Sequence, residues 1–197
     1  MKNLYTIGYA AFNDINAFIR ALKVNNVEAI ADVRSIPRSG YKPEFSRDYL
    51  TRQLRDNDIK YVFLGDNCGA RINDPACYIN GRVSYDKIKE TTIFKQGLER
   101  ILNGLNKYSI SLLCAEKDPL SCHRDILVCR NLKTYNLNIQ HIISENVLEP
   151  NLKAENRLLK QFKLDINDIF MSDEERLNLA YDKQGNKIAY NVQREEV

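Results

Sequence analysis

The sequence lacks any apolar run that approaches the roughly 20 residues a membrane-spanning helix requires, and no signal peptide is recognisable at its start. Its five cysteines are odd in number and irregularly spaced, which does not fit a framework of disulfides. We therefore expect a cytoplasmic protein with free thiols and no membrane association.

The spacing typical of structural zinc sites is absent too, because the sequence contains no Cys-x-x-Cys pair and only two histidines. Cys68, Cys77, Cys114 and Cys122 could bind zinc with these histidines only if the fold gathered them. The excess of Lys and Arg over Asp and Glu, 29 to 26, is too small to indicate nucleic acid by itself. We assign no metal ligand and expect no cofactor.

What is present is an ordinary globular composition, 44% apolar and 28% charged over 197 residues. Apolar runs predict strands over 4–8, 27–34, 60–64, 110–113 and 137–143, with helices between them, the first capped by Asn13. Strands joined through a helix are typical of right-handed βαβ units. We predict an α/β, Rossmann-like three-layer fold with a mostly parallel sheet over residues 1–148, and a C-terminal helical extension over 149–197.

The stretch 112–124 is the candidate centre of the molecule. An apolar strand ends at Cys114, and either Asp118 or Ser121 is expected to cap the helix that follows. The thiol, imidazole and guanidinium of residues 122–124 then lie at a helix N-terminus, where free N–H groups favour an anion or a thiolate. The alternative for Cys114 is a small buried hydrophobic residue.

Asp32 and Arg34 follow the second strand, at the edge where open parallel sheets bind ligands. Residues two apart share a face of a strand, so these side chains either act on a ligand together or pair with each other.

The segment from Arg34 to Arg52 is the most basic part of the chain and carries interleaved aromatic residues. It predicts a surface for phosphates and bases or, alternatively, a helix that buries Phe45 and Tyr49 beneath solvated charges.

Several landmarks together resemble the family catalogued as domain of unknown function 488. They are Thr6-Ile7-Gly8-Tyr9, Asp32-Val33-Arg34 with Pro37 and Ser39, Leu64-Gly65, the segment from Cys114 to Pro119 with Cys122-His123-Arg124, and His141-Ile142. The tail over 180–190 is similar to the ending of longer members. The resemblance implies a Rossmann-like domain without an established reaction. Other members often have histidine where this chain has Tyr9, so a mechanism that used that histidine would not be shared.

We expect an enzyme that acts on a phosphate-bearing substrate, a nucleotide or nucleic acid, in a crevice at the carboxyl edge of the sheet. The candidate catalytic residues are Asp32, Glu116, Cys122 and His123, and the candidate substrate-binding residues are Tyr9, Arg34, Arg38, Cys114 and Arg124. Cys122 is expected to be a reactive thiol, and Cys129, two turns further along the helix, an inert one. The alternatives are a non-catalytic nucleic-acid-binding module and a thiol-redox or zinc-binding protein.

Overall fold

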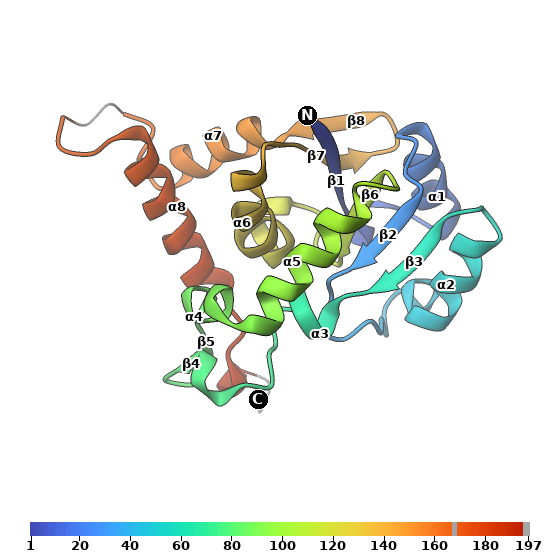
Figure 1. The fold of residues 1–197 in the computed structure, drawn as a ribbon, viewed down its shortest axis with the longest axis horizontal. Helices are drawn as coiled ribbons and strands as arrows, with labels where there is room; N and C mark the ends of the chain where they lie inside the picture. Colours follow the sequence, from blue (N-terminus) through green and yellow to red (C-terminus); the bar gives the residue numbers. More distant parts are fainter. Residues whose placement is uncertain (167–168, 195–197) are drawn as a thin grey trace.

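A six-stranded sheet forms the middle of the protein in a computed structural model that describes residues 1–166 and 169–194 (Figure 1). The strand order is β3-β2-β6-β1-β7-β8, and every neighbouring pair is parallel except β7 and β8. The strands are β1 (Lys2–Gly8), β2 (Ala29–Asp32), β3 (Lys60–Phe63), β6 (Ile110–Cys114), β7 (Leu137–Ser144) and β8 (Val147–Pro150). The predicted α/β, Rossmann-like fold with a mostly parallel sheet is confirmed.

Helices cover both faces of this sheet, because its strands alternate apolar side chains between two cores. Ile30 and Leu113 contribute to the core beneath α1 (Ile15–Val24) and α2 (Arg47–Arg55). Ala31 and Leu112 contribute to the opposite core, which also contains residues of α5 (Thr92–Gly104) and of the helical segment after β6. Three layers result, and a strand residue's position in the alternation decides which core it joins.

The chain after β6 departs from the predicted helix. Asp118 does cap a turn, since its side chain accepts the Leu120 N–H at 3.0 Å, but that turn is a short 3₁₀-helix over Pro119–Ser121. Cys122 is extended, and a π-helix, Arg124–Cys129, leads into the short α6 (Arg130–Leu132). Cys122 therefore lies beside the start of the following helix, as predicted, but that helix begins as a π-helix and not as an α-helix.

Other local predictions also change. The cap of α1 is Asp14, whose carboxylate accepts the Ala17 N–H at 2.8 Å, and not Asn13. The long polar loop after β3 contains the short α3 (Gly65–Cys68) and a hairpin of β4 (Tyr78–Ile79) and β5 (Arg82–Val83), followed by α4 (Tyr85–Glu90). The hairpin turns at Asn80-Gly81, where φ is 50° and 75°, as a type I′ turn requires.

The C-terminal part of the chain forms α7 (Asn151–Gln161) and α8 (Asp173–Ile188), which pack on each other (Figure 1). A capping box of Ser172 and Glu175 starts α8. Ala154, Leu158 and Tyr181 form a third core with Leu120 and Ile126, so the two helices cover the segment that follows β6. None of the helices in the described part of the chain has the length and apolar character that crossing a membrane requires.

Candidate functional site

A cavity of about 260 Å³ lies at the carboxyl edge of the sheet. The ends of β1, β2 and β6 meet there, because Gly8 pairs with Cys114 and Asp32 pairs with Leu113 in the parallel register. Six of the candidate catalytic and substrate-binding residues line the cavity: Tyr9, Arg34, Arg38, Cys114, Glu116 and His123. Asp32, Cys122 and Arg124 do not line it, and at most 1% of each is exposed.

Buried Cys114 and His123 form a polar cluster with the more exposed Glu116 at the wall of the cavity, which we call the thiol cluster. The Cys114 thiol donates to Glu116 Oε2 at 3.1 Å and lies 3.6 Å from His123 Nδ1. The other ring nitrogen, Nε2, is 2.8 Å from the carbonyl oxygen of Val33. Because a carbonyl oxygen only accepts, Nε2 carries hydrogen, and Nδ1 is the nitrogen that faces the thiol.

The carboxylate and the imidazole of this cluster are both shifted toward their charged forms. Burial opposes ionisation of Glu116, but hydrogen bonds from the Cys122 and Cys114 thiols outweigh it and hold the pKa of Glu116 below its usual value. Burial likewise opposes protonation of His123, whereas its contact with Cys122, the Val33 carbonyl and the Glu116 charge together raise its pKa. The cluster therefore combines a carboxylate, a basic imidazole and a thiol at one wall of a cavity.

Cys122 lies behind the cluster and away from solvent. Its sulfur is 3.9 Å from His123 Nδ1 and accepts the backbone N–H of Arg124 at 3.4 Å. Burial, followed by the neighbouring Cys114, raises the pKa of Cys122 well above that of a free thiol, and burial does the same for Cys129. Burial disfavours both thiolates, so the structure gives no support to the predicted contrast between a reactive Cys122 and an inert Cys129, and Cys114 is the thiol that borders the cavity.

Arg124 holds the loop after β6 in place. Its guanidinium is fully buried and donates to the carbonyl oxygens of Glu116 at 2.6 Å and Lys117 at 3.3 Å. Gly8 permits this close approach, since a Cβ there would lie 1.7 Å from the Glu116 carbonyl oxygen. The contacts of Arg124 position Glu116, and they leave its guanidinium outside the cavity lining.

Asp32 and Arg34 pair with each other, which confirms one of the two interpretations of their spacing. Two nitrogens of Arg34 donate to the Asp32 carboxylate at 2.9 and 2.6 Å, and the Tyr61 hydroxyl donates to it at 2.7 Å. Asp32 follows Ile30 in the strand alternation and so belongs to the side of α1 and α2, opposite to Cys114. It is 0% exposed and does not join the thiol cluster.

The basic segment is largely packed against its own protein. Phe45 is 0% exposed and stacks on Tyr9 with the ring centres 4.7 Å apart, while Tyr49 stays 41% exposed. Lys42 donates to a backbone carbonyl, and Arg47 lies over the ring of Phe63 at 4.7 Å. The predicted burial is thus correct for Phe45 and wrong for Tyr49.

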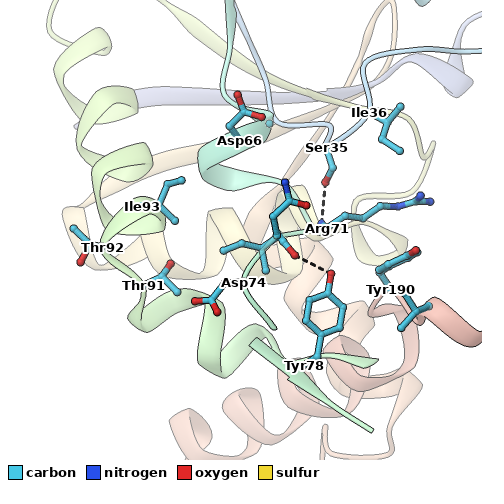
Figure 2. A pocket seen from close by; sticks show the side chains of 14 residues that line it. Ser35, Ile36, Asp66, Arg71, Asp74, Tyr78, Thr91, Thr92, Ile93 and Tyr190 are labelled. Carbon is cyan, nitrogen blue, oxygen red and sulfur yellow. Dashed lines mark hydrogen bonds between the residues drawn. The ribbon is translucent and has the colours of Figure 1, made fainter. Parts of the chain in front are cut away.

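The lining also includes three residues that were not among the candidates from sequence: Arg71, Tyr85 and Tyr190. The guanidinium of Arg71 lies 4.3 Å from the ring centre of Tyr190, and both residues also border a second cavity of about 910 Å³ (Figure 2). Figure 2 shows the Arg71 side chain between Ile36 and Tyr190. Arg71 belongs to the long polar loop after β3. Because loops of this length typically form binding segments, the loop is the sequence feature that could have indicated Arg71 as a site residue.

No curated protein and no solved structure matches this chain. A family model described as "Domain of unknown function DUF488" matches residues 14–130, and this range includes the thiol cluster and all of the cavity-lining residues named above except Tyr9 and Tyr190. The match extends over more than half of the 197 residues, so the chain belongs to the DUF488 family.

Proposed function

We propose that the protein is an enzyme, a hydrolase or transferase, that acts on a phosphate-bearing substrate in the cavity at the carboxyl edge of the sheet. The observation that carries this proposal is the combination of the thiol cluster at the wall of the cavity with arginines along the lining. Parallel sheets place ligands at this edge, where the loops after several strands meet. A nucleotide, or the phosphorylated end of a nucleic acid, is the substrate class that fits.

Two arginines supply the recognition of an anion. Arg38 is exposed and forms no ion pair within residues 1–166 and 169–194. Arg71 is held over Tyr190, which orients its guanidinium at the junction of the two cavities. Arg34 contributes less, because Asp32 neutralises it. Guanidinium groups bind phosphate oxygens through paired N–H donors, so Arg38 and Arg71 are the candidates for this role.

The thiol cluster supplies the chemistry. Glu116 and His123 are both within reach of the Cys114 sulfur, at 3.1 and 3.6 Å, so a proton can move between these groups. A nucleophile flanked by a base, with a third group that orients the base, is the arrangement used in covalent and acid-base catalysis. Here the Val33 carbonyl orients the imidazole. Cys114, rather than Cys122, is the candidate nucleophile, because of these two thiols only Cys114 lines the cavity.

A non-catalytic nucleic-acid-binding surface receives less support. Lys42 and Arg47 contact their own protein, and Arg52 lies 5.9 Å from the ring centre of Tyr49. Cations committed to internal contacts are less available to a phosphate backbone. The small concave site is therefore favoured over the extended basic segment.

Calorimetric titration with inorganic phosphate, AMP and a 5′-phosphorylated oligonucleotide tests the proposal. Arg38→Ala should weaken binding by roughly 10-fold or more, since a hydrogen bond to a charged group contributes about 1.5 to 3 kcal/mol. Arg55→Ala is the matched control, because Arg55 is an exposed arginine of α2 outside the cavity lining. Equal affinities for the two variants, or no binding by the wild type, would contradict the proposal.

A further inference from the structure

The geometry points to a site for one zinc-class transition-metal ion, formed by Cys114 Sγ, Cys122 Sγ and His123 Nδ1, with its fourth coordination position open to the cavity. The inference rests on the proposed function for the use of the cavity and changes one role in it, because a Cys114 thiolate that ligates the ion would leave the attack to a metal-bound water. Metal binding is nevertheless measurable without any substrate, so the two ideas can fail separately.

The three donor atoms already have the separations that such an ion requires. Each residue offers one ligand atom, and all three atoms lie within 4.8 Å of one another. His123 Nδ1 is 3.6 Å from Cys114 Sγ and 3.9 Å from Cys122 Sγ. Zinc–sulfur and zinc–nitrogen bonds of about 2.3 and 2.1 Å in a tetrahedron place sulfur and nitrogen roughly 3.6 Å apart. The ion would fit after small side-chain adjustments.

The surroundings of the ligands match those of a metal site. The Nε2–H of His123 donates to the Val33 carbonyl, which fixes the ring and directs the lone pair of Nδ1 toward both sulfurs. The Cys122 sulfur accepts the Arg124 backbone N–H, a contact that stabilises a coordinated thiolate. The guanidinium of Arg124 adds a buried positive charge near both sulfurs. The site thus has its outer shell of hydrogen bonds in place.

The open fourth coordination position would allow the metal ion to bind water or a substrate. Cys114 and His123 line the cavity, whereas Cys122 closes the site from behind. Three protein ligands and one position open to solvent distinguish catalytic zinc sites from structural ones, which have four. Glu116 lines the same cavity and lies 3.1 Å from Cys114 Sγ, so it can accept a proton from a metal-bound water.

The spacing of Cys114, Cys122 and His123 in the sequence does not match a known zinc-binding motif. Cys114 is the last residue of β6, and Cys122 returns to it only after the 3₁₀-turn over Pro119–Ser121. Of the other residues considered as zinc ligands, Cys68, Cys77 and His141 lie outside the group. The fold gathers three ligands from a stretch with no Cys-x-x-Cys motif.

Cobalt(II) titration of the reduced, chelator-treated full chain tests the inference. The wild type should bind about one equivalent and develop the charge-transfer and visible bands of a tetrahedral thiolate site, and zinc should displace the cobalt. Cys114→Ser, Cys122→Ser and His123→Gln should each weaken binding by more than about 100-fold, beyond the cost of outer-shell changes. Cys129→Ser is the matched control and should bind like the wild type, because Cys129 is a buried thiol outside the group.

A second readout uses only the wild type, so it does not depend on the folding of a variant. Bound zinc should slow alkylation of Cys114, read out by peptide mass spectrometry. A wild type without tetrahedral bands, binding that persists in all three ligand variants, or alkylation of Cys114 unchanged by zinc would each overturn the inference. Phosphate and AMP binding by the metal-free protein decides the proposed function independently of this result.

Discussion

His123 and His141, the chain's two histidines, lie in opposite surroundings. One ring nitrogen of His123 is fixed by Val33, and the other faces two thiols beside the cavity. Both ring nitrogens of His141 have protein partners, the Thr6 hydroxyl at 2.8 Å and Asn151 Oδ1 at 3.1 Å. Burial, aided by the charge of Arg124, lowers the pKa of His141 to about 3. Partners and exposure, rather than residue type, separate the candidate site from the core.

Two carboxylates repeat the contrast. Glu116 borders the cavity, accepts hydrogen bonds from thiols and has a lowered pKa. Asp125 is fully buried and lies 3.7 Å from His141, and neither of its oxygens has a hydrogen-bond partner among the described residues. Burial raises the pKa of Asp125 to about 7. Glu116 beside the cavity is thus shifted toward its charged form, whereas Asp125 and His141 in the sealed interior are shifted toward their neutral forms.

The largest expected effect concerns Arg124, which donates to the Glu116 carbonyl beside the cavity and to the Thr6 hydroxyl that contacts His141. Arg124→Met should lower the free energy of unfolding by about 3 to 5 kcal/mol, because it removes two hydrogen bonds from a buried charged group to the carbonyl oxygens of Glu116 and Lys117, each worth about 1.5 to 3 kcal/mol. Arg130→Met is the control: Arg130 pairs with the half-exposed Asp182, and we expect a loss near 1 kcal/mol. Urea denaturation measures both, and equal losses would contradict the structural role of Arg124.

A smaller effect appears in the pH dependence of stability. The folded-state pKa of His141 is depressed, so the unfolded chain binds more protons below pH 6.5 and acidification destabilises the fold. The folded-state pKa of Asp125 is raised, so acidification from pH 7 toward 4 stabilises the fold. The two contributions oppose each other in the wild type.

Replacing either Asp125 or His141 should reveal the pH dependence of stability that the other residue contributes. Asp125→Asn should lose stability on acidification from pH 7 to 5, and His141→Gln should gain it, each by on the order of 2 kcal/mol relative to the wild type. Urea denaturation at pH 7, 6 and 5 measures the slopes. If the unfolding free energy of both variants changed with pH as it does in the wild type, burial would not shift Asp125 and His141 toward their neutral forms.

The smallest effect is a difference in thiol reactivity. In the metal-free native protein, Cys114 should be alkylated by iodoacetamide before Cys122 and Cys129, because only Cys114 lines the cavity and burial disfavours the other two thiolates. Mass spectrometry of the modified peptides gives the order, with urea-unfolded protein as the reference. Modification of Cys122 ahead of Cys114 would contradict this prediction and support the original hypothesis that Cys122, at a helix N-terminus, is the reactive thiol.

Much of the fold could be predicted from sequence, because buried parallel strands appear as short apolar runs. The hairpin was missed although Asn80-Gly81 is the strongest short signal for one. The antiparallel strand Val147–Pro150 was missed because it is short, lies at an edge and contains Pro150. The π-helix could not be foreseen, since its apolar pattern over 126–132 also suits an α-helix.

The candidate site was harder to predict, although six of the candidate residues line one cavity. The expectation that residues after parallel strands meet at one edge brought Glu116 and His123 to the cavity. It did not place Asp32, because the side of the sheet on which Asp32 lies depends on the register between β2 and β6, which are far apart in sequence. Nor could it show that Arg124 points inward to carbonyl oxygens.

The most direct test of the account is NMR of the two imidazole rings, which a chain with two histidines makes simple to assign. AMP added to the metal-free protein should shift the ring resonances of His123, which lines the cavity, and leave those of His141 unchanged. His123→Gln assigns the signals. Shifts confined to His123 are the predicted result, whereas saturating AMP that moves neither ring, or moves His141 alone, would contradict the claim that this cavity is the functional site.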